Sequence, residues 1–538
     1  MQEEKNILQG PPVSIAEFQT TSLGQLILDQ LAVHGTKVAQ INAYTGEKQT
    51  FKDILNESSR LAVALSKQGV KRNDRIAVCS ENNVQFCIPV CAAFYLGATV
   101  CPLNPMYSEG ELKHSLNITK PKYIFISQIA AHNVCKIKHQ LSWSPKLIML
   151  TDMVDTKLPS IKTLTMDVHV DNNFQACPID LDKHIAVISC SSGTTGLPKG
   201  VMLSDKNVLT VIRNIAAASP TMVNNEVTSL ALLPFFHAYS FCVLLVRLAL
   251  GNKSVVLSRF DEKIFLHSIQ KYKIESLTLV PPLMVFLAKH PMVDRYDLSS
   301  VKEIWSGAAP LSEQIGKAVA KRLNISDIKQ GYGLTETTLA VTRTPQGDTK
   351  YGSVGKLAAG VSAKVISLDG DGPGKALGPN CRGELCFKGD LIMKGYCNDE
   401  GATAATIDKD GWLHSGDVGY YDEEGFFYIV DRLKELIKYK GFQVPPAELE
   451  ALLLSCPGIK DVAVVGLPNE ESGELPFAFV VKQDGTNITA DEVNNYVNDR
   501  VSSHKRLRGG IQFVDNIPKT ASGKILRRLL RDSLKSKL

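Results

Sequence analysis

The segment SCSSGTTGLPKGV, from Ser189 to Val201, combines three serines, two threonines and three glycines with one lysine, Lys199. It follows a short apolar run, Ile185–Ile188, which is typical of a buried strand. Backbone N–H groups of such a loop can converge on an anion, while the hydroxyls add donors and Lys199 adds positive charge. The Walker A pattern does not match, since Pro198 precedes Lys199 and Gly200 follows it. We interpret the segment as a phosphate-binding loop, with a surface turn of small residues as the alternative.

Helical patterns alternate with short apolar runs on both sides of this loop. Residues 51–69 have helical spacing and end at a glycine, and the chain after the loop predicts a helix near Lys206 with Ser204 or Asp205 as its N-cap. Predicted strands cover residues 75–79, 122–126, 147–150, 185–188, 254–257 and 276–280. This alternation favours α/β layers with largely parallel sheets.

The pattern changes after about residue 350. Gly-rich turns separate predicted strands at 383–387, near 411–414 and at 426–430, which indicates a small antiparallel or barrel-like part. A further unit is expected from Asp431 onward. Its predicted elements are helices at 446–454 and 490–501 and strands at 461–465 and 477–481, which suit a small α+β domain.

Composition excludes several classes of function. The 538 residues carry 60 basic and 55 acidic side chains, for a net charge of +5, without a basic stripe that would follow a nucleic-acid backbone. The twelve cysteines form no CxxC pair, so we expect free, buried thiols in a reducing compartment. Two uncharged stretches, 86–103 and 229–246, contain prolines and are interpreted as buried core rather than transmembrane segments.

The last three residues, Ser536-Lys537-Leu538, match the address that peroxisomal import receptors read. We therefore expect import into the peroxisome.

Further motifs follow the loop in a fixed order. They are Ser306–Pro310, Gln330–Thr338, Gly411–Asp417, Asp431–Arg432, Lys438–Gly441 and Pro518–Lys524. Together with the loop they resemble the signature of the adenylate-forming family, which includes acyl-CoA synthetases, nonribosomal-peptide adenylation domains and beetle luciferases. The resemblance implies a large domain, residues 1–430, and a mobile C-terminal domain, residues 431–538, with a hinge at Asp431.

The resemblance also implies which residues bind ATP and Mg2+. Thr335 would contact the α-phosphate and Glu336 would hold Mg2+, while Asp417 and Arg432 would bind the ribose. The β- and γ-phosphates would lie against Ser191, Ser192, Gly193, Thr194, Thr195, Gly196 and Lys199. The remaining nucleotide-binding residues would be Ala309, Pro310, Gln330, Gly331 and Tyr332.

Two lysines of the C-terminal domain are implied to act in turn. Lys524 would bridge the acyl carboxylate and the α-phosphate during adenylation. Rotation about Asp431 would then bring Lys438 and Gly441 to the site for attack by the coenzyme A thiolate. Without the resemblance, each residue has an ordinary structural interpretation. Lys524 would be a solvated lysine, Glu336 a carboxylate in the first turn of a helix, and Asp417 a residue that caps a turn.

The acid substrate is expected to enter beside His237, Ala238, Tyr239 and Leu339, with His237 as a gate or wall; a core histidine is the alternative. PPAELE, Pro445–Glu450, makes insect luciferase-like acyl-CoA synthetases and luciferases the most similar groups. Luciferases carry a serine where this chain has Leu339 and an arginine where it has Val211. A leucine cannot satisfy the polar atoms of luciferin, whereas an aliphatic tail needs no partner there.

The sequence therefore predicts a fatty acyl-CoA synthetase for medium or long chains, with ATP, Mg2+ and coenzyme A as its cofactors. The alternatives are a luciferase, an enzyme similar to 4-coumarate–CoA ligases, and a catalytically silent binding protein of the same fold.

Overall fold

The computed structural model describes residues 6–13, 18–152, 157–191, 198–218, 226–326, 328–368, 375–440, 442–520 and 523–535. The predicted loop residues Ser192 to Gly196, Gly441 and the C-terminal tripeptide lie outside these ranges. Peroxisomal import therefore stays a prediction.

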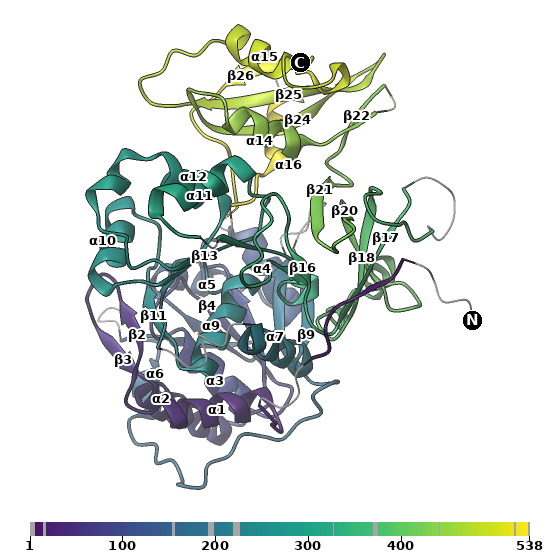
Figure 1. The fold of residues 1–538 in the computed structure, drawn as a ribbon. Coiled ribbons are helices and arrows are strands. Elements are labelled where there is room, and N and C mark those ends of the chain that lie inside the picture. Colours follow the sequence, from purple (N-terminus) through teal and green to yellow (C-terminus); the bar gives the residue numbers. More distant parts are fainter. Residues whose placement is uncertain are drawn as a thin grey trace.

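Two largely parallel sheets form the body of the protein (Figure 1). The first has the strand order β19 (Gly395–Tyr396), β9 (Lys199–Ser204), β8 (Ile185–Ser191), β5 (Thr99–Leu103), β4 (Arg75–Cys79), β6 (Tyr123–Ile126) and β7 (Lys146–Met149). The second has the order β16 (Lys356–Leu357), β15 (Thr342–Arg343), β14 (Ile328–Tyr332), β13 (Glu303–Ser306), β12 (Ser276–Leu279), β10 (Thr228–Ala231), β11 (Lys253–Val256), β2 (Val38–Asn42) and β3 (Lys48–Thr50). Both confirm the predicted α/β class, with antiparallel pairs at the sheet edges.

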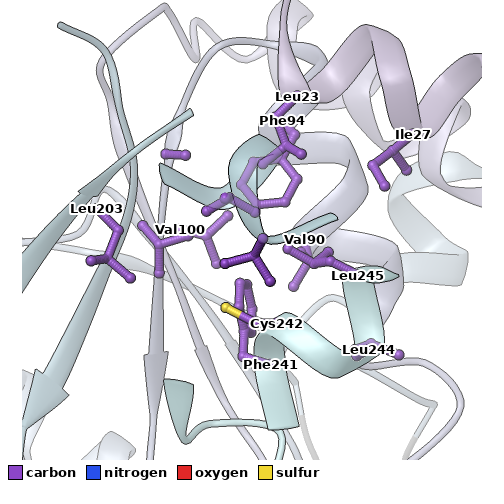
Figure 2. Close-up of a cluster of buried hydrophobic side chains, with 14 of the residues drawn as sticks. Leu23, Ile27, Val90, Phe94, Val100, Leu203, Phe241, Cys242, Leu244 and Leu245 are labelled. Atoms are coloured by element: carbon purple, nitrogen blue, oxygen red, sulfur yellow. The ribbon is translucent and has the colours of Figure 1, made fainter. Parts of the chain in front are cut away.

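A group of helices packs its apolar faces against both sheets. It consists of α1 (Leu23–His34), α2 (Phe51–Lys67), α3 (Cys87–Tyr95), α7 (Asp205–Ala218) and α9 (Ala238–Leu250). Their buried side chains share one cluster with Val100 of β5 and Val256 of β11, and Figure 2 shows part of it around Val90. Every residue of α3 is buried, as expected of a helix that is apolar all round. A Cβ at Gly24 would lie 2.3 Å from the Phe94 carbonyl oxygen, so α1 packs on α3 at van der Waals limits.

Further helices cover the outer faces. Helices α4 (Glu109–Thr119) and α5 (Gln128–Lys138) share a cluster with the first sheet. Helices α10 (Glu262–Tyr272), α11 (Pro281–Lys289) and α12 (Glu313–Leu323) share another with the second sheet. The short elements are α6 (Ile161–Thr165), α13 (Glu400–Thr406) and the 3-10 turns η1 (Pro291–Arg295), η2 (Thr335–Thr337) and η3 (Ser503–Lys505).

The region after residue 350 forms the expected antiparallel sheet, which lies beside the body in Figure 1. Its order is β1 (Leu8–Gln9), β17 (Val361–Ile366), β18 (Gly383–Gly389), β20 (Leu413–Tyr421) and β21 (Phe427–Arg432). Among the described residues the pairings follow a single path from β1 to β21. Asp431 and Arg432 are the last residues of β21, so the predicted hinge lies at the end of a strand.

The C-terminal residues form a separate α+β lobe, stacked over the body in Figure 1. Its sheet runs β23 (Phe442–Val444), β22 (Ile437–Tyr439), β25 (Gly473–Lys482) and β24 (Ile459–Asn469), with β26 (Gly510–Phe513) parallel to β25. Its helices are α14 (Pro446–Leu454), α15 (Ala490–Asn498) and α16 (Arg527–Lys535). The prediction that α15 extends to Val501 was wrong, because the chain turns at Asp499, where Arg500 and Val501 both donate to the Val497 carbonyl.

The two uncharged stretches form α3 and β5, and β10 and most of α9, whose residues are buried as predicted except for the partly buried Tyr239 and Val243 of α9. None of the helices in the described ranges has the length and hydropathy that crossing a bilayer requires. All twelve cysteines are free thiols, but the expectation of burial fails at Cys381, which is exposed just after a turn, and holds only in part at Cys135, Cys177 and Cys190, which are partly buried.

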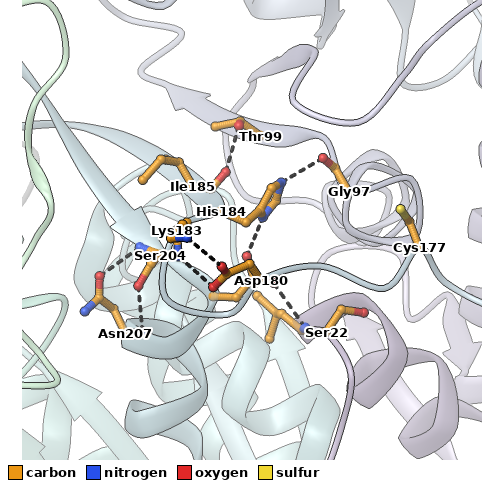
Figure 3. Close-up of polar contacts among 12 residues, drawn as sticks. Ser22, Gly97, Thr99, Cys177, Asp180, Lys183, His184, Ile185, Ser204 and Asn207 are labelled. Carbon is orange, nitrogen blue, oxygen red and sulfur yellow. Dashed lines mark hydrogen bonds and ion pairs between the residues drawn. The ribbon is translucent and has the colours of Figure 1, made fainter.

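A buried ion pair joins the loop before β8 to the start of α7. His184 Nδ1 lies 2.5 Å from Asp205 Oδ2, and His184 Nε2 lies 2.7 Å from the Gly97 carbonyl (Figure 3). The second oxygen of Asp205 accepts the Leu23 backbone N–H at 3.1 Å. This carboxylate therefore connects α7 to the loop before β8 and to the start of α1.

Substitution of Asp205 by alanine is expected to lower the free energy of unfolding by about 3 kcal/mol, because it leaves His184 and the Leu23 N–H buried without partners. Urea titration measures this. Asp182→Ala is the control, since Asp182 forms an exposed ion pair with Lys206 and should cost about 0.5 kcal/mol or less. Equal losses in the two variants would contradict the assignment.

Candidate active site

Strands β8 and β9 bring the two ends of the predicted phosphate loop side by side. Ser191 is paired with Lys199 across this antiparallel hairpin. A Cβ at Gly200 would lie 2.7 Å from the Ile118 side chain, so the strand after Lys199 passes close to α4. Ser204 caps α7, since its hydroxyl accepts the Asn207 N–H at 3.2 Å and its own N–H donates to Asn207. The backbone thus fixes Lys199 at the mouth of the loop.

Tyr396 connects Lys199 to the predicted metal ligand Glu336. The ammonium of Lys199 lies 4.8 Å from the centre of the Tyr396 ring. The Tyr396 hydroxyl donates to Glu336 Oε1 at 2.9 Å, and burial raises the pKa of that hydroxyl, which keeps it a donor. Glu336 and Thr335 occupy the turn η2, where the Glu336 carbonyl also accepts the Met393 N–H. Tyr396 therefore lies between the Lys199 ammonium and the Glu336 carboxylate.

Asp417 lies on β20 directly opposite Arg432 on β21. Its buried carboxylate accepts the Tyr332 hydroxyl at 2.6 Å, and Arg432 Nε lies 3.5 Å from its other oxygen. Burial raises the pKa of Asp417, although Arg432 and the Tyr332 hydrogen bond oppose that shift. The sheet register thus brings together three of the residues predicted to bind nucleotide.

Lys524 reaches this region from the C-terminal lobe on a tight turn. The Thr520 N–H donates to the Lys524 carbonyl at 2.8 Å, and the Lys524 N–H donates to the Thr520 hydroxyl at 3.1 Å. Gly523 has a φ of +81°, and a Cβ there would lie 3.4 Å from the side chain of Val280, before α11. The turn is therefore packed against the body of the protein.

The charges around Lys524 act on its pKa in opposite directions. Burial and the nearby Arg432 lower it to about 8, while Asp417 and Glu336 attract the proton. His237 lies close enough to be affected: burial and the Lys524 charge lower the pKa of His237 to about 4, so its imidazole is neutral at pH 7. The site thus combines a lysine whose pKa is lowered, Lys524, with a histidine that is uncharged at pH 7, His237.

A cavity of about 150 Å³ opens next to these groups. It is lined by Lys524, Thr335, Gly331 and all four residues of the predicted acid pocket, His237, Ala238, Tyr239 and Leu339. Val211 of α7 and Leu334 add apolar surface. The residues that the sequence assigned to phosphate chemistry and to the acid therefore share one space.

Other predicted residues lie outside the cavity lining. Gln330 is buried and its side-chain amide donates to the Ser353 carbonyl at 3.1 Å. Ala309 and Pro310 follow Gly307 and Ala308, which do line the cavity. Lys438 is exposed on β22 and its backbone N–H donates to Glu474, so its side chain is not at the site in this arrangement.

Several residues of the site were not predicted from the sequence. Tyr396 carried no motif, because its role depends on the pairing of β19 with β9. Arg247, Arg343 and Trp305 also line the cavity. Arg247 had a signal that could have been used, since it is the one charged residue in the otherwise apolar segment 238–250.

Comparison with known proteins agrees with this geometry. Residues 28–397 match the family described as AMP-binding enzyme, and residues 448–524 match the AMP-binding enzyme C-terminal domain. A luciferin 4-monooxygenase from Photuris pensylvanica is 45% identical over all of both chains. 4-coumarate–CoA ligase 2 from Nicotiana tabacum is 39% identical, over 94% of this chain and 93% of the relative.

Solved structures also match over nearly the whole length. ATP-bound MatB from Rhodopseudomonas palustris superimposes with a TM-score of 0.86 at 25% identity, covering 96% of this chain and 100% of that one. The apo form of MatB covers the same shares, also at 25% identity, with a TM-score of 0.74. The chain as a whole thus superimposes better on the ATP-bound form than on the apo form. The chain belongs to the AMP-binding, adenylate-forming enzyme family.

Proposed function

We propose that this protein is an AMP-forming acid–thiol ligase that converts medium- or long-chain fatty acids to their coenzyme A thioesters. The observation that carries the proposal is the common cavity of Lys524, Thr335 and the apolar wall at Leu339 and Val211. The relatives named as CoA ligases support the reaction class.

In the first half-reaction, a carboxylate oxygen of the acid attacks the α-phosphorus of ATP. The new P–O bond forms as the bond to pyrophosphate breaks, and negative charge builds on the phosphoryl oxygens. Lys524 is suited to stabilise that charge, because it is cationic below pH 8 and lines the cavity beside Thr335. The neutral imidazole of His237 leaves the carboxylate free of a competing cation.

Glu336 has the chemistry of a magnesium ligand. Mg2+ is usually held by one or two carboxylates together with substrate phosphates, and Glu336 lies beside the strand that begins with Lys199. Bound there, the ion would neutralise the polyphosphate. Asp417 and Arg432 would bind the ribose, since a buried carboxylate can accept from hydroxyl groups.

In the second half-reaction, the coenzyme A thiolate attacks the acyl carbon and AMP leaves. Lys524 occupies the approach in the present arrangement, while Lys438 is exposed on the same lobe. Rotation of the lobe about Asp431 would exchange the two lysines.

Oxidation of a luciferin is the second candidate, favoured by the 45% identity to a luciferin 4-monooxygenase. Against it, Leu339 and Val211 both line the cavity and neither can hydrogen-bond to an aromatic heterocycle.

Substitutions of Lys524 and Lys438 are expected to impair different half-reactions. Lys524→Ala should lower acid-dependent pyrophosphate release about 100-fold or more, because it removes a cation from the developing charge, yet still convert supplied acyl-AMP to thioester. Lys438→Ala should show the reverse. Lys434→Ala, an exposed lysine of the same lobe, is the control. Equal losses in both half-reactions for both variants would refute the alternation.

Adenylation should depend on pH through Lys524. Because the ammonium loses its proton above its pKa of about 8, kcat/KM for pyrophosphate release should fall about tenfold for each pH unit above that value. In Lys524→Arg the guanidinium keeps its charge, so any remaining activity should not fall over this range. A wild-type profile that stays level to pH 10 would contradict this assignment.

Substrate class is tested by measuring coenzyme A consumption with fatty, cinnamic and luciferin acids, with luminescence recorded in parallel. Decanoic and longer fatty acids are expected to give the highest kcat/KM, with little or no light from luciferin. The absence of pyrophosphate release with every acid would indicate a silent binding protein. Strong luminescence would favour the luciferase.

A further inference from the structure

Helix α9 carries one charged residue, Arg247, and buries it. Its side chain is 3% exposed. One terminal nitrogen donates to the Leu230 carbonyl and the other to the Thr278 hydroxyl, both at 3.2 Å, and Nε has no partner. A guanidinium has five N–H donors, so these two contacts leave donors unused.

Arg247 lacks a carboxylate partner within the described residues. Tyr239 and Glu303 are near enough to raise its pKa, but Tyr239 is a phenol, and the Glu303 oxygens accept from Ser276 and Lys329, each at 3.0 Å. Burial nevertheless lowers the pKa of Arg247 to about 10, which leaves the side chain cationic at neutral pH. An unpaired buried cation is costly, so this arrangement calls for an anion that the described chain does not supply.

Arg247 lies on the same helix as Ala238 and Tyr239 of the predicted acid pocket. Arg247 lines the same cavity as Lys524 and Thr335, and Ala238, at the start of α9, also lines it. Position 247 is nine residues after position 238, which along a helix is about 13.5 Å. The backbone of Arg247 therefore lies well along α9 from Ala238, while Tyr239 on the first turn of the helix is near enough to act on the guanidinium.

The cavity also has polar groups and a second cation. Arg343 lines it from β15 and donates to the Asn214 carbonyl at 2.6 Å, and burial lowers the pKa of Arg343 to about 10. Among the described lining residues there is no aspartate or glutamate. The methylenes of an extended acid would pass Leu339 and Val211 on the way to these guanidinium groups.

We propose that the preferred acid carries a second carboxylate at its distal end and that Arg247 binds it. This inference rests on the proposed ligase function and narrows its substrate class to α,ω-dicarboxylic acids. Thr278, which accepts from Arg247, positions the guanidinium, and Arg343 adds to the positive potential. The near carboxylate reacts at the α-phosphorus, while the distal one is held and stays unmodified.

The test compares matched pairs of acids, from hexanedioic to dodecanedioic acid against the monoacids of equal length, by kcat/KM for pyrophosphate release. The wild type should prefer the diacid at its best length by about tenfold or more, the usual effect of a hydrogen bond to a charged group. Arg247→Leu should reverse the preference, with activity on the monoacid kept or raised, and Arg247→Lys should retain part of it. Arg213→Leu is the matched control, since Arg213 is another arginine with an unpartnered Nε but donates to Phe18 and does not line the cavity.

The outcomes separate this inference from the proposed function. Preference for monoacids that Arg247→Leu does not change would overturn the inference and leave the ligase intact. Release of pyrophosphate with neither kind of acid would overturn the ligase itself. If Arg247→Leu proves unfolded by circular dichroism, Thr278→Val provides the second variant and should lower diacid kcat/KM while sparing the monoacid. No change in the diacid-to-monoacid ratio there would also count against the proposal.

Discussion

The central physical constraint in this structure is the placement of one lysine charge in a partly desolvated cavity. Lys524 is surrounded by Asp417 and Glu336, which stabilise its charge, and by Arg432, which opposes it, and the balance lowers its pKa to about 8. A charge so placed is costly when no anion is present, and an incoming phosphate or carboxylate relieves that cost. The binding of substrate and the docking of the C-terminal lobe are therefore linked, since Lys524 belongs to the lobe and its partners to the body.

The partners of Lys524 are held by sheet register rather than by local sequence. Asp417 faces Arg432 because β20 pairs with β21, and Glu336 is fixed by Tyr396 because β19 pairs with β9. Each carboxylate thus keeps one oxygen on a tyrosine hydroxyl, Tyr332 or Tyr396. Such bonds orient the carboxylates before a ligand arrives, which reduces the reorganisation that the reaction requires.

Much of this arrangement could be predicted from the sequence, and the exceptions have a common cause. The strand before the phosphate loop, the alternating helices and strands, and the helix at 446–454 follow from local periodicity and turn residues, whereas β9 and its antiparallel pairing with β8 were not predicted. The grouping of Lys524 with Thr335 and Leu339 could be expected from resemblance alone, because no local rule connects residues so far apart. Tyr396 and Arg247 were missed, since their roles arise when distant strands and helices meet around one cavity.

Helix α14 explains how the lobe can dock and still be released. The Asp431 carboxylate accepts the Ala447 N–H at 2.8 Å near the start of this helix, and the Lys289 ammonium donates to the Leu454 carbonyl at 2.8 Å at its end. An acid at the N-terminus and a cation at the C-terminus are the placements that a helix dipole favours. In the rotation about Asp431 that we propose, Asp431 would keep its bond to α14, whereas Lys289 belongs to α11 of the body. A rotation that brings Lys438 inward would therefore break the Lys289 contact and withdraw Lys524 in the same movement, so the two lysines would not occupy the cavity together.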